Sequence, residues 1–110
     1  MADCLFCQII KGKTKTDFVY EDKDIVAFKD IHPKAPVHIL ILPKKHIDKL
    51  QDVGDNDRDL LGSILLVAKK IAISQKIDQG YKIIVNCGRK GGQEIFHLHF
   101  HLLGDWKNKN

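Results

Sequence analysis

Three histidines alternate with apolar residues over positions 97–103, where the sequence reads His-Leu-His-Phe-His-Leu-Leu. Side chains of a β-strand point alternately to opposite faces, so this segment as a strand would place His97, His99 and His101 on one face. Neighbouring imidazoles would then be about 7 Å apart at the backbone, and the outer two about 13 Å. Because imidazole has an ordinary pKa of about 6.5, it can donate, accept or attack as a nucleophile near neutral pH.

The length of this row favours an extended anionic ligand over a single metal ion. Two histidines two residues apart on a strand can bind one zinc ion through bonds of about 2.0–2.1 Å, but three on one strand span too far to converge. A chain of phosphates fits the row better. The alternative is a row of packed, hydrogen-bonded imidazoles, which is the usual state of a single histidine but a poor account of three in strict alternation.

The residues before the row support a phosphate site. Gly91 and Gly92 allow close backbone approach, and successive N–H groups there can face phosphate oxygens. A glycine pair by itself is more often only a turn. Asn86, at the end of the preceding predicted strand, is placed to orient a neighbouring imidazole through a hydrogen bond.

The elements that would position these side chains follow from hydrophobic periodicity and turn residues. Strands are predicted over residues 18–20, 25–28, 37–42, 81–86 and 96–103, with 37–42 buried on both faces. A long helix is predicted between an N-cap at Asp55 and a stop at Gly80, and residues 5–10 form either a short helix or a loop pinned by Cys4 and Cys7. Strands and one long helix without regular β-α-β alternation indicate an α+β fold with a mostly antiparallel sheet.

The long helix carries two apolar stripes. The broad stripe is expected to face the core and consists of Leu60, Leu61, Ile64, Leu65, Val67, Ala68, Ile71 and Ala72. The stripe on the opposite side consists of Gly62, Leu66, Ile73 and Ile77. It needs a second surface to cover it, which indicates either self-association or a larger sheet within the chain.

Composition excludes several classes of protein. The 110 residues are 44% hydrophobic and 29% charged, which is ordinary for one globular domain and not for a disordered chain. The net charge of +4 comes from scattered lysines without interleaved aromatics, so we expect no nucleic-acid polymer as partner. No apolar run is long enough for a membrane, and no secretory signal opens the sequence. The odd number of cysteines, three, suits a reducing compartment, and the cytoplasm is the expected location.

Taken together, these residues resemble the histidine triad (HIT) family, and within it the Hint branch of nucleotide-binding proteins. The family signature is His, apolar, His, apolar, His, apolar, apolar, and further similar segments stand at family spacing at residues 28–33, 35–38, 43–47 and 91–93. The resemblance covers residues 3–104 of a single domain spanning 1–110, with 105–110 as a C-terminal tail. It implies a HIT-like α+β domain in which a five-stranded antiparallel sheet, one long helix and a short N-terminal helix pair into a homodimer with a continuous sheet.

The resemblance also implies an activity: binding of purine nucleotides and hydrolysis at the α-phosphate of nucleoside 5′-phosphoramidates, with release of the nucleoside monophosphate. His99 would be the nucleophile and form a nucleotidyl-imidazole intermediate. His101 would stabilise the transferring phosphoryl group with Asn86 nearby, and His97 and His38 would orient the nucleophile or relay protons. No cofactor would be required. The remaining ligand contacts would come from Phe6, Ile9, Phe28 and Ile31 around the base, Asp30 on the ribose, and Gly92 and Gln93 at the phosphate.

Two departures from the family pattern affect the leaving group. Glu94 stands where Hint proteins of the animal type carry a serine that assists the leaving amine, and a carboxylate there would repel a phosphoryl substrate unless it is protonated or turned away. The tail also lacks the proline-rich ending of the family. A dinucleoside polyphosphate hydrolase, or a nucleotide-binding or interaction module with incidental catalysis, therefore remains as an alternative.

Some family members, mostly microbial, resemble this chain at four positions and hold zinc there. Cys4, Cys7, His46 and His97 would form a tetrahedral Cys₂His₂ set for structural zinc, leaving His99 and His101 for chemistry. The alternative is two reduced cysteines near a frayed terminus. Cys87 is expected to be a buried apolar filler.

Overall fold

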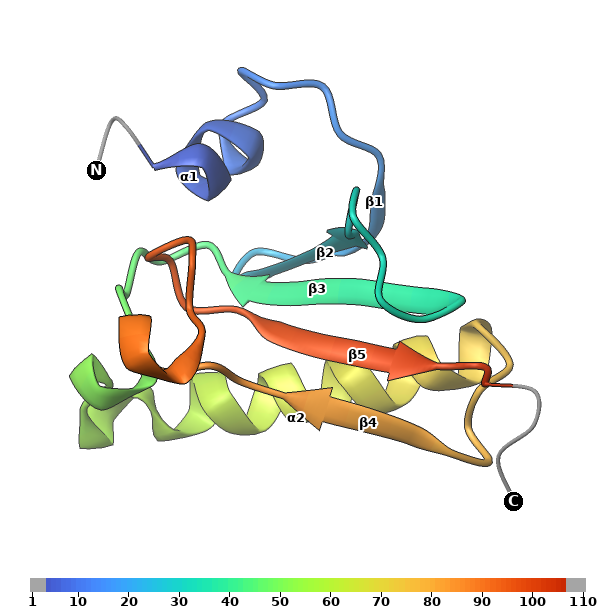
Figure 1. Ribbon diagram of the computed structural model, residues 1–110. Helices are drawn as coiled ribbons and strands as arrows, with labels where there is room; N and C mark the ends of the chain where they lie inside the picture. Colours follow the sequence, from blue (N-terminus) through green and yellow to red (C-terminus); the bar gives the residue numbers. More distant parts are fainter. Residues whose placement is uncertain (1–3, 107–110) are drawn as a thin grey trace.

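A five-stranded antiparallel sheet forms the centre of the protein, as a computed structural model that describes residues 4–106 shows (Figure 1). The strands lie in the order β1-β2-β3-β5-β4. Their bounds are Phe18–Glu21 for β1, Ile25–Lys29 for β2, Val37–Pro43 for β3, Tyr81–Ile84 for β4 and Phe100–Gly104 for β5. The short helix α1 spans Leu5–Ile10, and the long helix α2 spans Arg58–Ser74. The α+β fold predicted from the sequence is confirmed.

The sheet has an apolar cluster on each face. One contains Leu98, Phe100 and Leu102 together with the buried side of α2. The other lies beneath α1, where Phe6 and Ile9 pack on side chains of β2 and β3. Because β3 contributes to both clusters, all its residues after the first are buried, as predicted for 37–42.

The long helix begins and ends at residues other than those predicted. A 3₁₀ turn over Asp55–Asp57 precedes α2, so Asp57 rather than Asp55 stands at its N-cap. At the other end Lys76 adopts φ 62°, and the N–H of Ile77 donates to the Ala72 carbonyl at 2.9 Å. This is the hydrogen bond of a Schellman motif. Ile77 is buried by this turn, so apolar burial ends the helix well before Gly80.

The last strand is shorter than predicted, because regular pairing starts at Phe100 and not at residue 96. The N–H of Leu98 donates instead to the Ile47 carbonyl at 2.6 Å. Alternation of the two faces nevertheless persists through the irregular part: Leu98 and Phe100 both join the α2 cluster. The imidazoles therefore lie on the α1 side of the sheet, although His97 and His99 precede the strand itself.

Apolar side chains remain exposed along α2 and β4. Leu65, which was predicted to face the core, is 48% exposed. Of the second predicted stripe, Leu66 and Ile73 are more than half exposed, whereas Ile77 is buried. Every residue of β4 is exposed, and β4 forms one edge of the sheet. Within residues 4–106 no helix has the length and apolarity that crossing a bilayer requires.

Replacing Gly104 with alanine is expected to lower the free energy of unfolding by about 1–3 kcal/mol, because the core is already filled at this point. An added Cβ would lie 2.7 Å from Cδ1 and 3.2 Å from Cβ of Ile77. Urea unfolding measures the loss, which should be smaller when the same change is made in an Ile77→Ala protein. Gly80→Ala is the control, since nothing lies within 4 Å of its added Cβ. Equal stability of the two alanine variants would contradict this packing.

Candidate functional site

His99 is held so that one specific ring nitrogen carries the lone pair. Its Nδ1 lies 2.7 Å from the His97 carbonyl oxygen, which can only accept, so Nδ1 carries the proton and Nε2 is unprotonated. The ring is buried, and the Phe6 ring stands perpendicular to it with centroids 5.1 Å apart. Burial lowers the pKa of His99, against the hydrogen bond to His97, which raises it. A neutral imidazole with a free Nε2 is a nucleophile or a base.

His101 has the opposite tautomer, which a chain of two further groups determines. The backbone N–H of Lys34 donates to Nδ1 of His38 at 3.0 Å, so the proton of neutral His38 is on Nε2. That nitrogen lies 2.9 Å from Nδ1 of His101, which therefore accepts. The proton of His101 is left on Nε2, the one buried side-chain nitrogen or oxygen among residues 4–106 that has no hydrogen-bond partner.

Sheet register explains why His38 and His101 meet. His38 in β3 pairs with Leu103 in β5, so His101 is its diagonal neighbour on the same face. The ring centroids of His99 and His101 are 5.0 Å apart. A lone pair on one ring and an unpartnered N–H on the next thus stand side by side. Such a pair can attack an electrophilic centre and donate a hydrogen bond to an oxygen on it.

Asp30 lies beside His38. Its Oδ2 is 3.4 Å from Nε2 of His38, and its Oδ1 accepts the N–H of His32 at 2.8 Å. Its negative charge raises the pKa of His38, although burial, the larger effect, lowers it. Asp30 follows directly after β2 and is partly exposed.

The four predicted metal ligands come together from three parts of the chain. Cys4 and Cys7 flank the first turn of α1, His46 follows β3, and His97 precedes β5, with all four ligand atoms within 4.8 Å of one another. Nδ1 of His97 is 3.5 Å from Sγ of Cys4 and 3.6 Å from Sγ of Cys7, and Nδ1 of His46 is 3.2 Å from Sγ of Cys7. Tetrahedral zinc with ordinary bond lengths sets sulfur and nitrogen about 3.5 Å apart.

Tautomers also fit this set to a metal. Nε2 of His97 donates to the Pro43 carbonyl at 2.7 Å, and Nε2 of His46 donates to Oδ1 of Asp48 at 2.6 Å. Both Nδ1 atoms are thereby free to coordinate, and such outer partners commonly orient metal-binding histidines. Burial and then the neighbouring Cys4 raise the pKa of the Cys7 thiol, so a cation is what would favour its thiolate. The residues present fit zinc.

A second cluster, formed by Asp30, His38 and His101, does not fit a metal. Nε2 of His38 faces the other two groups but carries the proton, because Nδ1 accepts from the Lys34 backbone. A neutral histidine cannot coordinate through its protonated nitrogen. This cluster is a hydrogen-bonded chain.

The glycine loop of residues 88–92 is held by Gln93, whose predicted contact with phosphate the structure does not favour. The buried Gln93 amide donates to the carbonyls of Asp48 at 2.7 Å and Ile95 at 3.0 Å, and it accepts the Gly88 N–H at 2.9 Å. Both its N–H groups are therefore engaged. Gly92 adopts φ 90°, and its added Cβ would lie 3.9 Å from Cγ of Asn86, so Asn86 borders this loop.

Of the three parts predicted for His97, its contacts favour orienting His99 and binding zinc over relaying protons. It is fully buried and directs one ring nitrogen to Pro43 and the other to the cysteines. It orients His99 only through its backbone carbonyl. Three contacts that determine the site were missed from sequence. The carbonyl of Pro43 and the N–H of Lys34 are backbone groups without a sequence signal, whereas Asp48, two residues after His46, could have been found from that spacing.

The predicted base-pocket residues separate into two groups. Phe6, Ile9 and Phe28 are buried in the cluster beneath α1, with Phe6 and Phe28 packed edge to face. Ile31 is 84% exposed on the loop after β2. Glu94, the residue at the departure from the family pattern, is exposed too.

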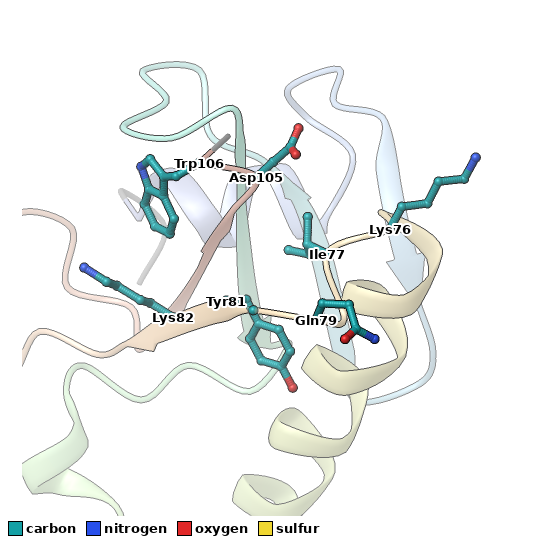
Figure 2. Close-up of a pocket in the computed structure, with 8 residues that line it drawn as sticks. Lys76, Ile77, Gln79, Tyr81, Lys82, Asp105 and Trp106 are labelled. Atoms are coloured by element: carbon teal, nitrogen blue, oxygen red, sulfur yellow. The ribbon is translucent and has the colours of Figure 1, made fainter. Parts of the chain in front are cut away.

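A cleft of about 470 Å³ lies at the other end of β5, where Lys82 and Trp106, two of its lining residues, extend to the same side of the strand end (Figure 2). Nζ of Lys82 is 5.3 Å from the centroid of the Trp106 ring. None of the predicted site residues lines this cleft. Residues 107–110 of the predicted tail lie outside the described residues.

Acid is expected to destabilise the protein through His101. Burial, followed by the neighbouring His99 and His38, lowers its pKa from 6.5 to about 4. The unfolded chain therefore binds a proton first, and stability present above pH 6.5 is lost as the pH falls through 4. Urea unfolding at pH 7 and at pH 4.5 measures how far the free energy of unfolding falls with acid. In His101→Gln this fall should be smaller than in wild type by about 1–2 kcal/mol, a modest figure because solvent screens a half-buried group. Exposed His32→Gln is the control, and equal losses in all three proteins would contradict the assignment.

Many known proteins are similar to this chain. A family model described as "Scavenger mRNA decapping enzyme C-term binding" matches residues 3–110. Protein HitA of Neisseria gonorrhoeae is 42% identical over 104 residues, covering 94% of this chain and 97% of that protein. The chain belongs to the histidine triad family.

Two solved structures of histidine triad proteins superpose closely on this one. A HIT family hydrolase from Legionella pneumophila has a TM-score of 0.91 at 46% identity, covering 97% of this chain and all of the other. A histidine triad protein from Clostridium difficile has a TM-score of 0.94, also at 46% identity, covering 100% of this chain and 96% of the other. These similarities confirm the family and the HIT-like fold.

Proposed function

We propose that this histidine triad protein is a nucleotide-binding hydrolase that cleaves purine nucleoside 5′-phosphoramidates at the α-phosphate and releases the nucleoside monophosphate. The observation that carries the proposal is the complementary pair of tautomers: Nε2 of His99 holds a lone pair beside the unpartnered Nε2–H of His101. The family membership and the hydrolases among the structural relatives support it.

The reaction would proceed in two displacements. Nε2 of His99 attacks phosphorus, the phosphorus–nitrogen bond breaks, and the amine leaves with the electron pair and takes up a proton from water. Water then attacks the nucleotidyl-histidine, which frees the monophosphate and restores the lone pair of His99. The Nε2–H of His101 donates to a phosphoryl oxygen, where negative charge increases during each displacement.

The other site residues bind or position. Phe6, Ile9 and Phe28 supply an apolar wall for the base, and exposed Ile31 closes over it. Asp30 accepts the ribose hydroxyls, while Gly92 and Asn86 border the phosphate. His38 fixes the tautomer of His101. Gln93 and His97 act through the backbone that they hold, and neither contacts the phosphate.

Zinc is the metal that we propose for the Cys₂His₂ set, with Cys4, Cys7, His46 and His97 as its ligands. It supplies no chemistry to the reaction. Bound there, it would tie α1 to the segments that follow β3 and precede β5, and so hold Phe6 against His99.

A homodimer is the assembly that we propose, with β4 pairing to β4 and α2 packing on α2. The exposed edge of β4 and the adjoining Leu66 and Ile73 support this surface. The double variant Leu66→Glu with Ile73→Glu is expected to sediment as a monomer at concentrations where the wild type is a dimer, because each buried carboxylate would be unpaired. Val19→Glu, at the opposite edge of the sheet, should leave the dimer intact. A monomeric wild type would contradict the proposal.

A panel of adenosine conjugates tests the function. Adenosine 5′-phosphoramidates and diadenosine polyphosphates are incubated with the protein, and AMP release is followed by chromatography. Preferential release from the phosphoramidates is expected. Preference for the polyphosphates would transfer the assignment to the alternative hydrolase, and tight AMP binding without release from any conjugate would favour a nucleotide-binding module. Glu94→Ser, measured on the same panel, shows whether this carboxylate affects the leaving group.

A further inference from the structure

We propose that Asp30 is a positioning residue that couples recognition of the sugar to the hydrogen-bond donor of His101, so that a nucleotide with both ribose hydroxyls raises the rate of the chemical step as well as the affinity. The inference rests on the proposed nucleotide hydrolysis. It concerns how the substrate's own sugar completes the catalytic arrangement.

The starting observation is one N–H group close to two electron-rich groups. Nε2–H of His38 is hydrogen-bonded to Nδ1 of His101 at 2.9 Å, and Oδ2 of Asp30 lies 3.4 Å from the same nitrogen as an ion-pair contact. His38 cannot resolve this competition through its other nitrogen, because Nδ1 accepts from the Lys34 backbone. A carboxylate is the stronger acceptor of the two, since it is charged. The bond to His101 is the one that forms, and the charge of an unengaged Asp30 weakens it by attracting the same proton.

Asp30 is placed to respond to a ligand. Its backbone N–H donates to the His38 carbonyl at 3.0 Å, and its Oδ1 accepts from the N–H of His32, so the side chain is held over His38. The Asp30 side chain is 20% exposed, whereas that of His38 is 2% exposed. A ligand in solvent can thus reach Asp30 directly but His38 only through Asp30.

Hydroxyl groups that donate to the Asp30 carboxylate would weaken its pull on the His38 proton. The bond from His38 to Nδ1 of His101 would then strengthen. Hydrogen bonds in a chain polarise one another, so the Nε2–H of His101 would become a better donor. Because that donor acts on the phosphoryl group as its charge increases, the gain appears in the rate of the chemical step.

The electrostatic surroundings are consistent with this coupling. The charged or titratable groups that act on His101 are His99, His38, Asp30 and Lys34, and Asp30 is the one carboxylate among them. His38 is acted on by Asp30 and Lys34. Among the described residues, no carboxylate other than Asp30 acts on either ring, so none could replace it in this coupling.

The experiment compares two substrates in two proteins. Adenosine 5′-phosphoramidate and its 2′,3′-dideoxy analogue are hydrolysed by wild type and by Asp30→Asn, and kcat and KM are measured separately for all four combinations. Asparagine has the shape of aspartate and still accepts hydrogen bonds, but it lacks the charge. Asp78→Asn, which removes an exposed carboxylate outside the site, is the matched control.

In wild type and in Asp78→Asn, removing the two hydroxyls is expected to lower kcat about tenfold in addition to raising KM. In Asp30→Asn the two substrates should differ in KM but agree in kcat within about twofold. The wild-type comparison needs no variant, so a misfolded Asp30→Asn would not remove the test.

Three results would overturn the coupling. If the dideoxy substrate has a higher KM but an unchanged kcat in the wild type, the sugar hydroxyls act in binding alone, and the proposed hydrolysis stands. If Asp30→Asn keeps the full difference in kcat, the coupling runs through another residue. If the wild type releases AMP from neither substrate, the proposed function itself fails and the coupling fails with it.

Discussion

Replacing His99 with alanine is expected to lower kcat for an adenosine 5′-phosphoramidate by at least about 10⁴-fold, while AMP still binds within a fewfold of the wild-type affinity. The loss is large because neither His97 nor His38 offers a lone pair that could replace Nε2 of His99. His97 directs its two ring nitrogens to Pro43 and the cysteines, and His38 carries its proton on Nε2. Binding is expected to persist because the apolar wall that we propose for the base, formed by Phe6 and Phe28, does not include His99.

The measurement is steady-state hydrolysis together with calorimetric titration of AMP. Trapping of the nucleotidyl-histidine provides a second readout. Wild-type protein quenched during turnover in denaturant without acid should carry one nucleotidyl group, located on the peptide that contains His99. His32→Ala is the matched control, since it removes an exposed imidazole. Turnover by His99→Ala above one hundredth of the wild-type rate would exclude His99 as the nucleophile.

Replacing Cys7 with serine is expected to abolish stoichiometric zinc binding and lower the melting temperature by at least about 10 °C. Cys7 contacts both metal-facing histidines, with Sγ 3.2 Å from Nδ1 of His46 and 3.6 Å from Nδ1 of His97. Its loss would free α1 from two distant segments at once. Because α1 also carries Phe6, the affinity for AMP should fall together with stability.

The matched control is Cys87→Ser, which changes the third cysteine, outside the Cys₂His₂ set. Zinc content by emission spectroscopy, melting temperature and AMP affinity are measured on all three proteins purified without added metal. A wild-type protein that contains no zinc and gains no stability on its addition would reduce Cys4 and Cys7 to ordinary thiols. Equal effects of the two serine variants would point to a general cost of losing sulfur.

Some features of the site were readable directly from short sequence patterns. Alternation over residues 97–103 separated Leu98 and Phe100 from the histidines because the period of an extended chain is two, and this held even where regular pairing is lost. The resemblance to zinc-binding family members indicated Cys4 and Cys7 as ligands, and their Sγ atoms lie close to Nδ1 of His46 and of His97. The helix ends were less predictable, since burial of Ile77 stopped α2 where no glycine stands.

Residue types alone did not show which groups Gln93 and His97 bind. Both have partners far away in the chain: Gln93 donates to the carbonyl of Asp48, and His97 donates to that of Pro43. Backbone carbonyls carry no sequence signal. A polar side chain whose partner is a distant carbonyl therefore cannot be told from a free one before the chain is folded.

The sequence by itself determined which side chains share a face, which cysteines and histidines were available, and which family the chain resembles, because these depend on local period and residue type. Only the tertiary structure decided the protonation of each imidazole. A ring's tautomer is set by whichever donor or acceptor reaches its other nitrogen, and here those groups come from Lys34, Pro43, Asp48 and the carbonyl of His97. That choice separates the proposed nucleophile, the proposed donor and the two proposed metal ligands among side chains of identical chemistry.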